Sequence, residues 1–247
     1  MKKYIQGDIH EIIKSLDDNS IDFIYTDPPF GTTKASWDKG LRWNELFDEM
    51  WRVLKDDGII CLYASMPFTY ELLKHETPKY HYSWKKNNKT GFFQAKYQPL
   101  RQIEEIFIYY KKKGTYNPQM IGDQYKAKRN VKVGGRNGYY GDNLKDKQNE
   151  YIAKDGDGHT GLYPTTFKDW NIRKDKSGIT RTDEQIDYFI KTYSNENDVV
   201  LDMTCHCEYV GKRCEILNRK YIGVDLYLDH YIHGTISNHQ TTKMEYK

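Results

Sequence analysis

The feature that most constrains the fold is a short apolar run over residues 21–26 that ends in Asp27-Pro28-Pro29-Phe30. An apolar run of this length, bounded by turn residues, predicts a buried strand. Neither proline can donate a hydrogen bond to a neighbouring strand, so the two prolines end the strand abruptly. We therefore expect a carboxylate, a rigid corner and an aromatic ring at the carboxyl end of a strand, which is where ligands bind in open α/β sheets.

Strands and helices are predicted to alternate along much of the chain. Strands are expected over residues 4–8, 59–63, 82–84, 103–110, 198–202 and 220–225. Apolar residues at helical spacing predict helices over 9–16, around 46–54, near 69–74, from 183 past 190, and over 209–217. The second helix is expected to end at a turn over 55–58, which contains a glycine. This alternation predicts an α/β fold with a doubly wound, mostly parallel sheet.

Length and composition indicate a globular protein. A chain of 247 residues accommodates one domain with a sizeable insertion. Disordered chains are poor in aromatic residues, whereas aromatics make up 15% of this chain and include 22 tyrosines. We expect many of these tyrosines at a hydrated surface. The formal net charge of +3 says little about nucleic acid, because the distribution of charge matters more than its total.

The region from about 111 to 176 is dense in Lys, Arg, Gly, Asn and Tyr and has almost no apolar periodicity. A loop region of this length inside a compact domain is usually functional. Basic residues interleaved with tyrosines are typical of nucleic-acid contacts, which makes Arg129, Lys132 and Arg136 candidates for binding DNA. Acidic residues are also present, so a solvated insertion is the alternative.

A second basic cluster follows the strand predicted at 82–84. It contains Lys85, Lys86 and Lys89, which are candidates for phosphate contacts, and its alternative is a solvated lysine turn.

Several other kinds of protein are disfavoured. No apolar stretch approaches the ~20 residues needed to span a bilayer, and the polar N-terminus does not resemble a signal peptide. The four cysteines lack a disulfide pattern, which indicates reduced thiols in an intracellular compartment. Cys205-His206-Cys207 with Cys214 lacks the paired spacing of a zinc site, so we expect loop or core cysteines and no metal.

The Asp27 corner suits an exocyclic adenine amine. The lone pair of that amine is delocalised into the ring, and hydrogen-bond acceptors for its protons make the nitrogen more nucleophilic. The Asp27 carboxylate and the Pro28 carbonyl are suitable acceptors, held rigid by Pro29, and Phe30 is placed to stack on the base. A base inside a duplex is out of reach and has to be flipped out. From these residues alone, an ordinary strand-ending turn is an equal alternative.

The chain resembles the β-class, circularly permuted DNA amino-methyltransferases that use S-adenosylmethionine, in particular the small phage-type members. The matching segments follow the family's order from end to end except in the basic region. They are Gly7-Asp8, residues 17–22, 27–33, Trp37-Asp38, 89–92, 99–101, 116–120, Leu201-Asp202 and 223–225.

The resemblance implies a single Rossmann-like methyltransferase domain over residues 1–247. Its parts are a catalytic half at 1–110, a target-recognition insertion at about 111–176, a cofactor half at about 177–230 and a polar tail at 231–247. It also implies double-stranded DNA as partner, with a homodimer or a partner subunit left open. The acidic Asp-Pro-Pro form implies adenine N6 in preference to cytosine N4.

The resemblance also supplies a cofactor site for S-adenosylmethionine. Asp8 matches the position that contacts the cofactor adenine, and Asp202 the acid near the methionine amine. Asp225 is expected to bind the ribose hydroxyls, the usual role of an acid at the end of that strand. Thr204 lies in the loop that follows Asp202.

Two segments depart from the family pattern. The loop at 203–211 carries His206 and Glu208 near the places where the family has glycines, which allow close backbone approach. The family's His-Pro-Thr-Gln-Lys-Pro segment is replaced by residues 177–182, which retain at most a basic residue. These departures motivate a second hypothesis, in which the chain is a catalytically inactive relative kept as a DNA-binding, partner or structural (virion) protein.

Overall fold

The computed structural model describes residues 1–35, 38–121, 163–172 and 181–228, together with the backbone of 236–238. The chain divides into two compact units, one formed by 1–117 with 165–247 and the other by 118–164. Every helix and strand of the described residues belongs to the first unit.

A nine-stranded sheet, in the order β6-β4-β5-β3-β2-β7-β8-β1-β9, organises the first unit. Strand β5 runs antiparallel to β3 and β4, and the other neighbours pair in parallel. The strands are β1 (Lys2–Gln6), β2 (Ile21–Thr26), β3 (Leu54–Ala64), β4 (Tyr80–Thr90), β5 (Arg101–Tyr109), β6 (Phe167–Asp169), β7 (Val199–Asp202), β8 (Lys220–Asp225) and β9 (Ile236–Asn238).

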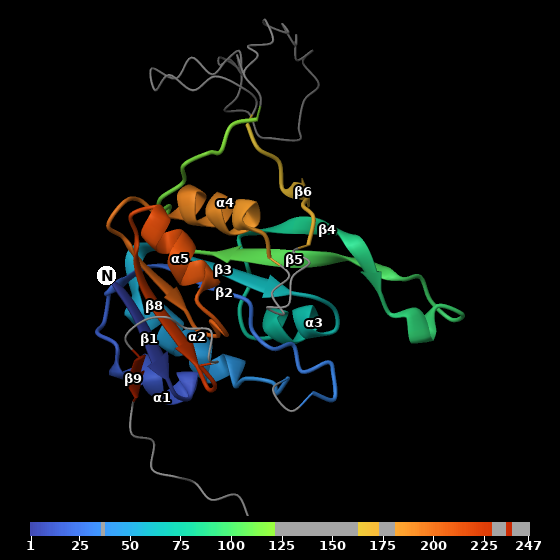
Figure 1. The fold of residues 1–247 in the computed structure, drawn as a ribbon, viewed down its shortest axis with the longest axis horizontal. Helices are drawn as coiled ribbons and strands as arrows, with labels where there is room; N and C mark the ends of the chain where they lie inside the picture. The colour runs from blue at the N-terminus through green and yellow to red at the C-terminus, as the bar shows by residue number, and fades with distance from the viewer. Residues whose placement is uncertain (36–37, 122–162, 173–180, 229–235, 239–247) are drawn as a thin grey trace, which may run out of the picture. The chain divides into compact units, whose positions relative to one another are not determined.

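Helices cover both faces of the sheet (Figure 1). On one face lie α1 (Ile9–Ile12) with the 3-10 turn η1 (Ile13–Ser15), α2 (Trp43–Val53) and α3 (Phe68–Leu73). On the other lie α4 (Asp183–Tyr193) and α5 (Tyr209–Ile216). Two hydrophobic cores result, one around Met50 and one around Phe189. Successive residues of β2 face opposite cores, Ile24 the first and Tyr25 the second. The predicted doubly wound, mostly parallel fold is confirmed.

The turn expected at 55–58 is part of a strand. Strand β3 begins at Leu54, directly after α2, and its pairing with β2 shifts register between Ile21 and Phe23. The extra residues are absorbed as a bulge, where a Cβ on Gly58 would lie 2.6 Å from Leu54 Cγ. Gly58 therefore permits a close approach within the strand and does not stop the helix.

Two short strands lie where no regular structure was predicted. Strand β6 belongs to the stretch assigned to the basic region and pairs with residues 83–85 of β4, and β9 belongs to the polar tail. Strands of three residues are too short to show periodicity, so sequence patterns cannot reveal them.

The described tyrosines divide between surface and core: Tyr70, Tyr97 and Tyr227 are exposed, as expected, but many others are buried. The side chains of Tyr25, Tyr63, Tyr82 and Tyr193 are at most 3% exposed, in the core beneath α4. Their hydroxyls bond to one another, with 2.9 Å between Tyr25 and Tyr63 and 2.7 Å between Tyr82 and Tyr193. Mutual hydrogen bonding removes the cost of burying these hydroxyls, so composition alone does not distinguish core from surface tyrosines.

Gly211 sets how closely α5 approaches the sheet. An added Cβ would lie 2.3 Å from Tyr4 Oη and 2.9 Å from the Tyr221 ring. Both tyrosines are fully buried and cannot move aside freely. We expect Gly211→Ala to lower the free energy of unfolding by about 1–3 kcal/mol, measured by urea denaturation. Gly40→Ala is the matched control, because its added Cβ meets nothing within 4 Å. Equal losses in both variants would contradict this account.

Candidate active site

The predicted site residues gather at one edge of the sheet. Strands β2, β7, β8 and β1 are parallel neighbours, and each is followed or ended by an acid: Asp27, Asp202, Asp225 and Asp8. The registers align these ends, since Asp202 pairs with Gly223 and Gln6 pairs with Asp225. The Asp27 corner and the three acids expected to bind the cofactor therefore share the carboxyl edge, where ligands bind in open α/β sheets.

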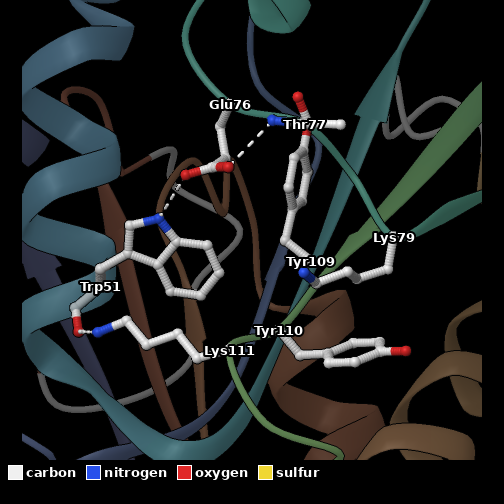
Figure 2. A pocket seen from close by; sticks show the side chains of 7 residues that line it. All are labelled: Trp51, Glu76, Thr77, Lys79, Tyr109, Tyr110 and Lys111. Carbon is white, nitrogen blue, oxygen red and sulfur yellow. Dashed lines mark hydrogen bonds between the residues drawn. The ribbon is translucent and has the colours of Figure 1, made fainter.

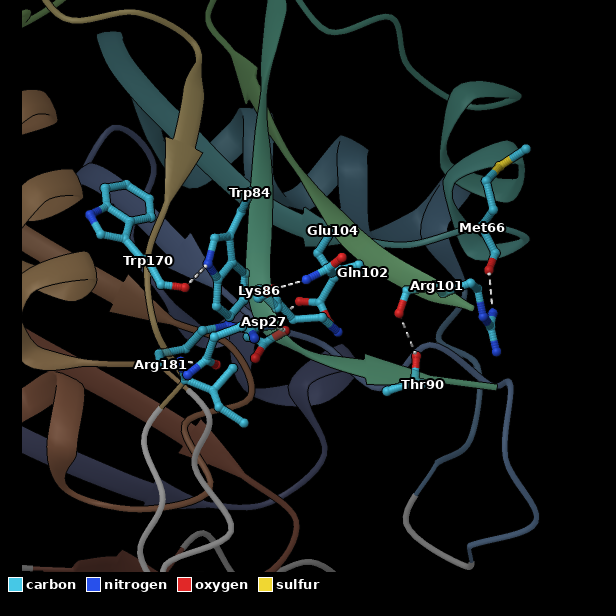
Figure 3. Close-up of polar contacts among 12 residues, drawn as sticks. Asp27, Met66, Trp84, Lys86, Thr90, Arg101, Gln102, Glu104, Trp170 and Arg181 are labelled. Atoms are coloured by element: carbon cyan, nitrogen blue, oxygen red, sulfur yellow. Dashed lines mark hydrogen bonds and ion pairs between the residues drawn. The ribbon is translucent and has the colours of Figure 1, made fainter. Parts of the chain in front are cut away.

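Asp27 is held by a buried arginine, Arg181, which lies 154 positions later in the sequence (Figure 3). Arg181 Nη2 donates a hydrogen bond of 2.7 Å to Asp27 Oδ1 and lies 3.0 Å from Glu104 Oε2. The other oxygen of Glu104 accepts a bond of 2.5 Å from Lys86. Two cations and two carboxylates thus alternate in a chain that runs from β4 to Asp27.

Aromatic rings hold the Arg181 guanidinium in place. Its central carbon lies 4.3 Å from the centre of the Tyr63 ring and 4.7 Å from that of Trp84. The Trp84 indole donates to the Trp170 carbonyl at 2.9 Å, which fixes the ring. The Arg181 side chain is 8% exposed, whereas Asp27 is 36% exposed. Arg181 is therefore a rigid internal support, and Asp27 is the member of the chain that reaches solvent.

The charges of this chain depend on one another. Burial raises the pKa of Asp27, and the attraction of Arg181 opposes that rise only in part. Burial also acts to raise the pKa of Glu104, but Arg181 and Lys86 outweigh it and the pKa falls below its usual value. For Arg181, burial lowers the pKa and the two carboxylates more than restore it, so the guanidinium stays charged. A permanent cation beside Asp27 favours its ionised, hydrogen-bond-accepting form.

Sequence analysis did not predict the roles of Arg181 and Glu104. Arg181 belongs to the segment 177–182, which was expected to form an altered cofactor wall and of which 177–180 lie outside the described residues. It directly precedes Thr182, the N-cap of α4, whose hydroxyl accepts from the Gln185 amide at 3.3 Å. The role of Glu104 was indicated by its position inside an apolar strand, because an acid there is rarely buried without a partner of opposite charge.

The turn after the corner is closed by Asp38. Its carboxylate accepts from the backbone amides of Gly31, Thr32 and Thr33 at 2.7, 2.9 and 2.6 Å. Burial acts to raise the pKa of Asp38, but a hydrogen bond from the Thr33 side chain and those from the three amides outweigh it and lower the pKa. Gly31 has a φ of 65°, which favours glycine. The turn is therefore anchored around one carboxylate.

Phe30 packs against a second phenylalanine. Its ring is stacked on that of Phe68, with the centroids 5.1 Å apart and the planes 17° from parallel. Phe68 in turn contacts Trp43 of α2. The orientation of the Phe30 ring is thus set by the core beneath it.

Asp202 is the most deeply buried of the acids at this edge. It is 3% exposed and accepts from the Thr204 amide and the Tyr221 hydroxyl, each at 3.2 Å. Burial raises the pKa of Asp202 to about 8, and the charges of Asp225 and Asp27 add to the rise. The hydroxyls of Thr204 and Thr26 are 3.0 Å apart, so the loop after Asp202 is joined to the strand that ends at the corner.

The other two acids are less buried and engage backbone amides. Asp225 accepts from His206 and Tyr227, both at 2.9 Å. Asp8 is the N-cap of α1 and accepts from the His10 amide at 2.9 Å. Each acid therefore fixes the chain around it while remaining partly exposed.

The loop at 203–208 accommodates His206 and Glu208, the two residues that depart from the expected glycines, in different ways. His206 has a φ of 50°, the left-handed conformation that favours glycine, and its side chain is exposed. The Glu208 side chain is 9% exposed and pairs with Lys212 one turn along α5. The loop thus keeps a conformation suited to glycine despite the change of sequence.

The candidate DNA contacts lie in different surroundings. Lys86 is buried and paired with Glu104, so its charge supports the Asp27 site and is not presented to a phosphate. Lys85 pairs with Asp169 at 2.6 Å, and Lys89 is exposed. Arg129, Lys132 and Arg136 lie outside the described residues.

Other kinds of site find no support in the described part of the chain. Its cysteines are all buried free thiols, and no three His, Cys, Asp or Glu residues there are grouped as metal ligands. Among the same residues, no helix is both long and apolar enough to cross a membrane.

A hollow of about 320 Å³ lies away from this edge (Figure 2). Tyr109 in its wall ends β5, which runs antiparallel to β3, so this wall lies toward the amino ends of the parallel strands. The Trp51 indole in the same wall donates a hydrogen bond of 3.0 Å to Glu76. The site chemistry belongs to the opposite edge.

Comparison with known proteins agrees with this geometry. A family model described as DNA methylase matches residues 21–235. The chain is 27% identical over 229 residues to the Type II methyltransferase M.HpaI of Haemophilus parainfluenzae, covering 87% of this chain and 67% of that protein. It is 27% identical over 237 residues to the Type II methyltransferase M.BamHI of Bacillus amyloliquefaciens, covering 91% of this chain and 54% of that protein. The chain therefore spans about half the length of this second relative.

Solved structures share the fold at lower identity. PvuII DNA methyltransferase, described as cytosine-N4-specific, is 14% identical with a TM-score of 0.60, over 92% of this chain and 82% of its own. M1.HpyAVI in complex with SAM is 18% identical with a TM-score of 0.54, over 91% of this chain and 92% of its own.

Proposed function

The chain belongs to the DNA methylase family, and from this premise we propose that it transfers a methyl group from S-adenosylmethionine to adenine N6 in double-stranded DNA, with the target base flipped out. The observation that carries the proposal is Asp27, partly exposed at a strand end and held on a buried arginine. The choice of adenine N6 over cytosine N4 rests on the acidic Asp-Pro-Pro form of the corner.

The corner can act on the amine in three ways. Asp27 Oδ1 is engaged by Arg181, so Oδ2 and the Pro28 carbonyl are the acceptors proposed for the amine protons. Phe30, fixed by Phe68, is proposed to stack on the base. Both acceptors stand on a rigid corner, which orients the nitrogen before reaction at little further entropic cost.

The residues beside the corner fit S-adenosylmethionine. When bound, the cofactor supplies an electrophilic methyl group. Asp202 offers a buried carboxylate for a cationic group, and Asp225 and Asp8 offer partly exposed carboxylates for hydroxyl and amine donors. The His206 side chain is exposed, and the Glu208 carboxylate is paired with Lys212. We also propose that the chain is circularly permuted. Strands β7 and β8, which end in the expected cofactor acids Asp202 and Asp225, follow β2, the strand of the Asp27 corner, in the sequence.

Isothermal titration of S-adenosylmethionine into the protein, with and without DNA, tests the cofactor. Transfer of labelled methyl groups to genomic DNA, followed by mass spectrometry of the nucleosides, tests the reaction. We expect micromolar binding and N6-methyladenine. Detection of N4-methylcytosine would show that the target base is cytosine and not adenine.

A second candidate function is an inactive relative that binds DNA or a partner protein. The substitutions at His206 and Glu208 favour it, because they replace the residues that permit close backbone approach. If S-adenosylmethionine does not bind either with or without DNA, the inactive relative is supported and the proposed methyltransferase activity is wrong.

A further inference from the structure

The hairpin formed by β4 and β5 extends well beyond the body of the first unit (Figure 1). Its base contains the buried network, since Trp84 pairs with Glu104. Its outer end begins where Thr90 pairs with Arg101, and η2 (Phe92–Gln94) forms the turn beyond. Along β5, Arg101 lies three positions before Glu104, a rise of about 10 Å. The outer end thus continues the two strands that carry the buried network.

Large aromatic side chains at this outer end are exposed to solvent. Phe92 is 65% exposed, Phe93 is 103% exposed and Tyr97 is 89% exposed. We call these three residues the aromatic tip. Unpartnered aromatic rings grouped at the end of a projecting hairpin indicate a surface that is covered by a ligand.

The charge of the hairpin identifies the kind of ligand. Residues 85–103 contain five basic residues and no acidic residue. Of these, Lys89, Lys96 and Arg101 are exposed beside the aromatic tip. A second copy of this hairpin would bring like charges together, whereas a DNA backbone complements them. Exposed aromatic rings flanked by basic residues suit bases together with phosphates.

The hairpin is held in position relative to the site. Arg101 Nη1 donates to the Met66 carbonyl at 3.1 Å, and Gln102 donates to the Lys86 carbonyl at 2.8 Å (Figure 3). Gly91, with a φ of 89°, allows the chain to turn into η2. The hairpin is therefore tied to the segment before α3 at Arg101, directly before its outer end.

We propose that the aromatic tip inserts between bases of the bound DNA and stacks on the bases exposed there. This inference rests on the proposed function, since it requires DNA as the substrate. Lys89, Lys96 and Arg101 contact the flanking phosphates, and Phe92 and Phe93 fill the opened step, as apolar wedges do in proteins that open a duplex.

Fluorescence anisotropy with two labelled DNAs tests the proposal independently of the target sequence. One is a duplex of mixed sequence, and the other is the same duplex with a short central gap that exposes stacking faces. We expect the wild type to bind the gapped DNA about tenfold more tightly than the intact duplex. The Phe92→Ala/Phe93→Ala variant should lose this preference and bind both DNAs alike.

Two controls separate stacking from charge and from general exposure. Lys89→Ala/Lys96→Ala should weaken binding to both DNAs equally and reduce the salt slope by about two, because two phosphate contacts are lost. Tyr70→Ala removes an exposed aromatic ring of α3 and should preserve the preference for the gap. An unchanged preference in the Phe92→Ala/Phe93→Ala variant would overturn the proposal.

Parallel measurements distinguish the remaining outcomes. A wild type that methylates genomic DNA without preferring the gap overturns the wedge alone. A wild type that neither methylates nor binds DNA overturns the proposed function as well. If sedimentation shows that Phe92→Ala/Phe93→Ala converts a dimer into a monomer while the preference for the gap persists, the tip is a self-association surface and the proposal is wrong.

Discussion

Asp27→Ala is expected to lower methyl transfer on the order of 10²–10³-fold, the loss typical of removing one preorganised polar group from an active site. DNA affinity should stay nearly unchanged, because phosphate contacts elsewhere supply most of it. Rates with labelled S-adenosylmethionine and anisotropy with duplex DNA measure the two effects separately. A variant that still methylates at the wild-type rate would show that Asp27 is not the amine acceptor.

The structure makes a sharper prediction for Asp27→Asn. Arg181 donates to Oδ1, so the amide oxygen of an asparagine is drawn toward the guanidinium. Its NH₂ group then faces the target amine, and two donors oppose each other. Asp27→Asn should therefore be about as inactive as Asp27→Ala, although asparagine retains an acceptor.

Removing the arginine donor tests this reasoning. In Asp27→Asn/Arg181→Gln the amide is free to rotate, and activity should recover relative to Asp27→Asn alone. Thermal unfolding of each variant is the control for folding, because loss of one member of a buried ion pair typically costs about 3–5 kcal/mol. A double variant no more active than Asp27→Asn would show that the arginine does not set the orientation of the side chain.

The backbone around Asp27 could be predicted, but its support could not. The apolar run of β2 and the two prolines are local signals, and they located the strand and its end correctly. The contact between Asp27 and Arg181 spans 154 positions and joins segments with no shared periodicity. Which distant residues meet depends on the topology of the whole fold. Local sequence patterns do not specify that topology, because it depends on how all the elements pack together.

The tyrosines and glycines show the same limit. A tyrosine has an apolar ring and a polar hydroxyl, so its burial depends on whether a partner for the hydroxyl comes within reach. Tyr193 finds Tyr82 only because α4 packs across the sheet. Gly58 was interpreted as a helix stop because glycine serves several backbone roles, and the bulge in β3 appears only when the register of the strands is known.

Cofactor affinity is expected to rise with pH because Asp202 has to ionise. Its pKa is raised to about 8, so most of the cofactor-free protein carries a neutral Asp202 at pH 6. If the cationic group of S-adenosylmethionine binds the carboxylate, the dissociation constant should fall nearly tenfold per pH unit between about pH 6 and 7.5. Calorimetry in buffers of different ionisation enthalpy should show about one proton released on binding at the lower pH.

Asp202→Asn should remove both the pH slope and the proton release. Asp8→Asn is the matched control, since it removes a partly exposed carboxylate at the same edge and should weaken binding without abolishing the slope. An identical slope in wild type and Asp202→Asn would exclude Asp202 as the titrating group.

The same carboxyl should govern the stability of the cofactor-free protein. Because the pKa of Asp202 is higher in the folded state than the ~3.9 of an unfolded chain, the folded protein binds more protons between these values. The contribution of Asp202 to the free energy of unfolding is therefore greatest below about pH 4. This contribution is lost as pH rises toward 8, by at most about 1.4 kcal/mol per pH unit. Urea denaturation at several pH values should show a smaller decline for Asp202→Asn, whose neutral side chain does not charge in the core. Saturating S-adenosylmethionine should oppose the decline in the wild type alone, because its cation compensates the buried carboxylate.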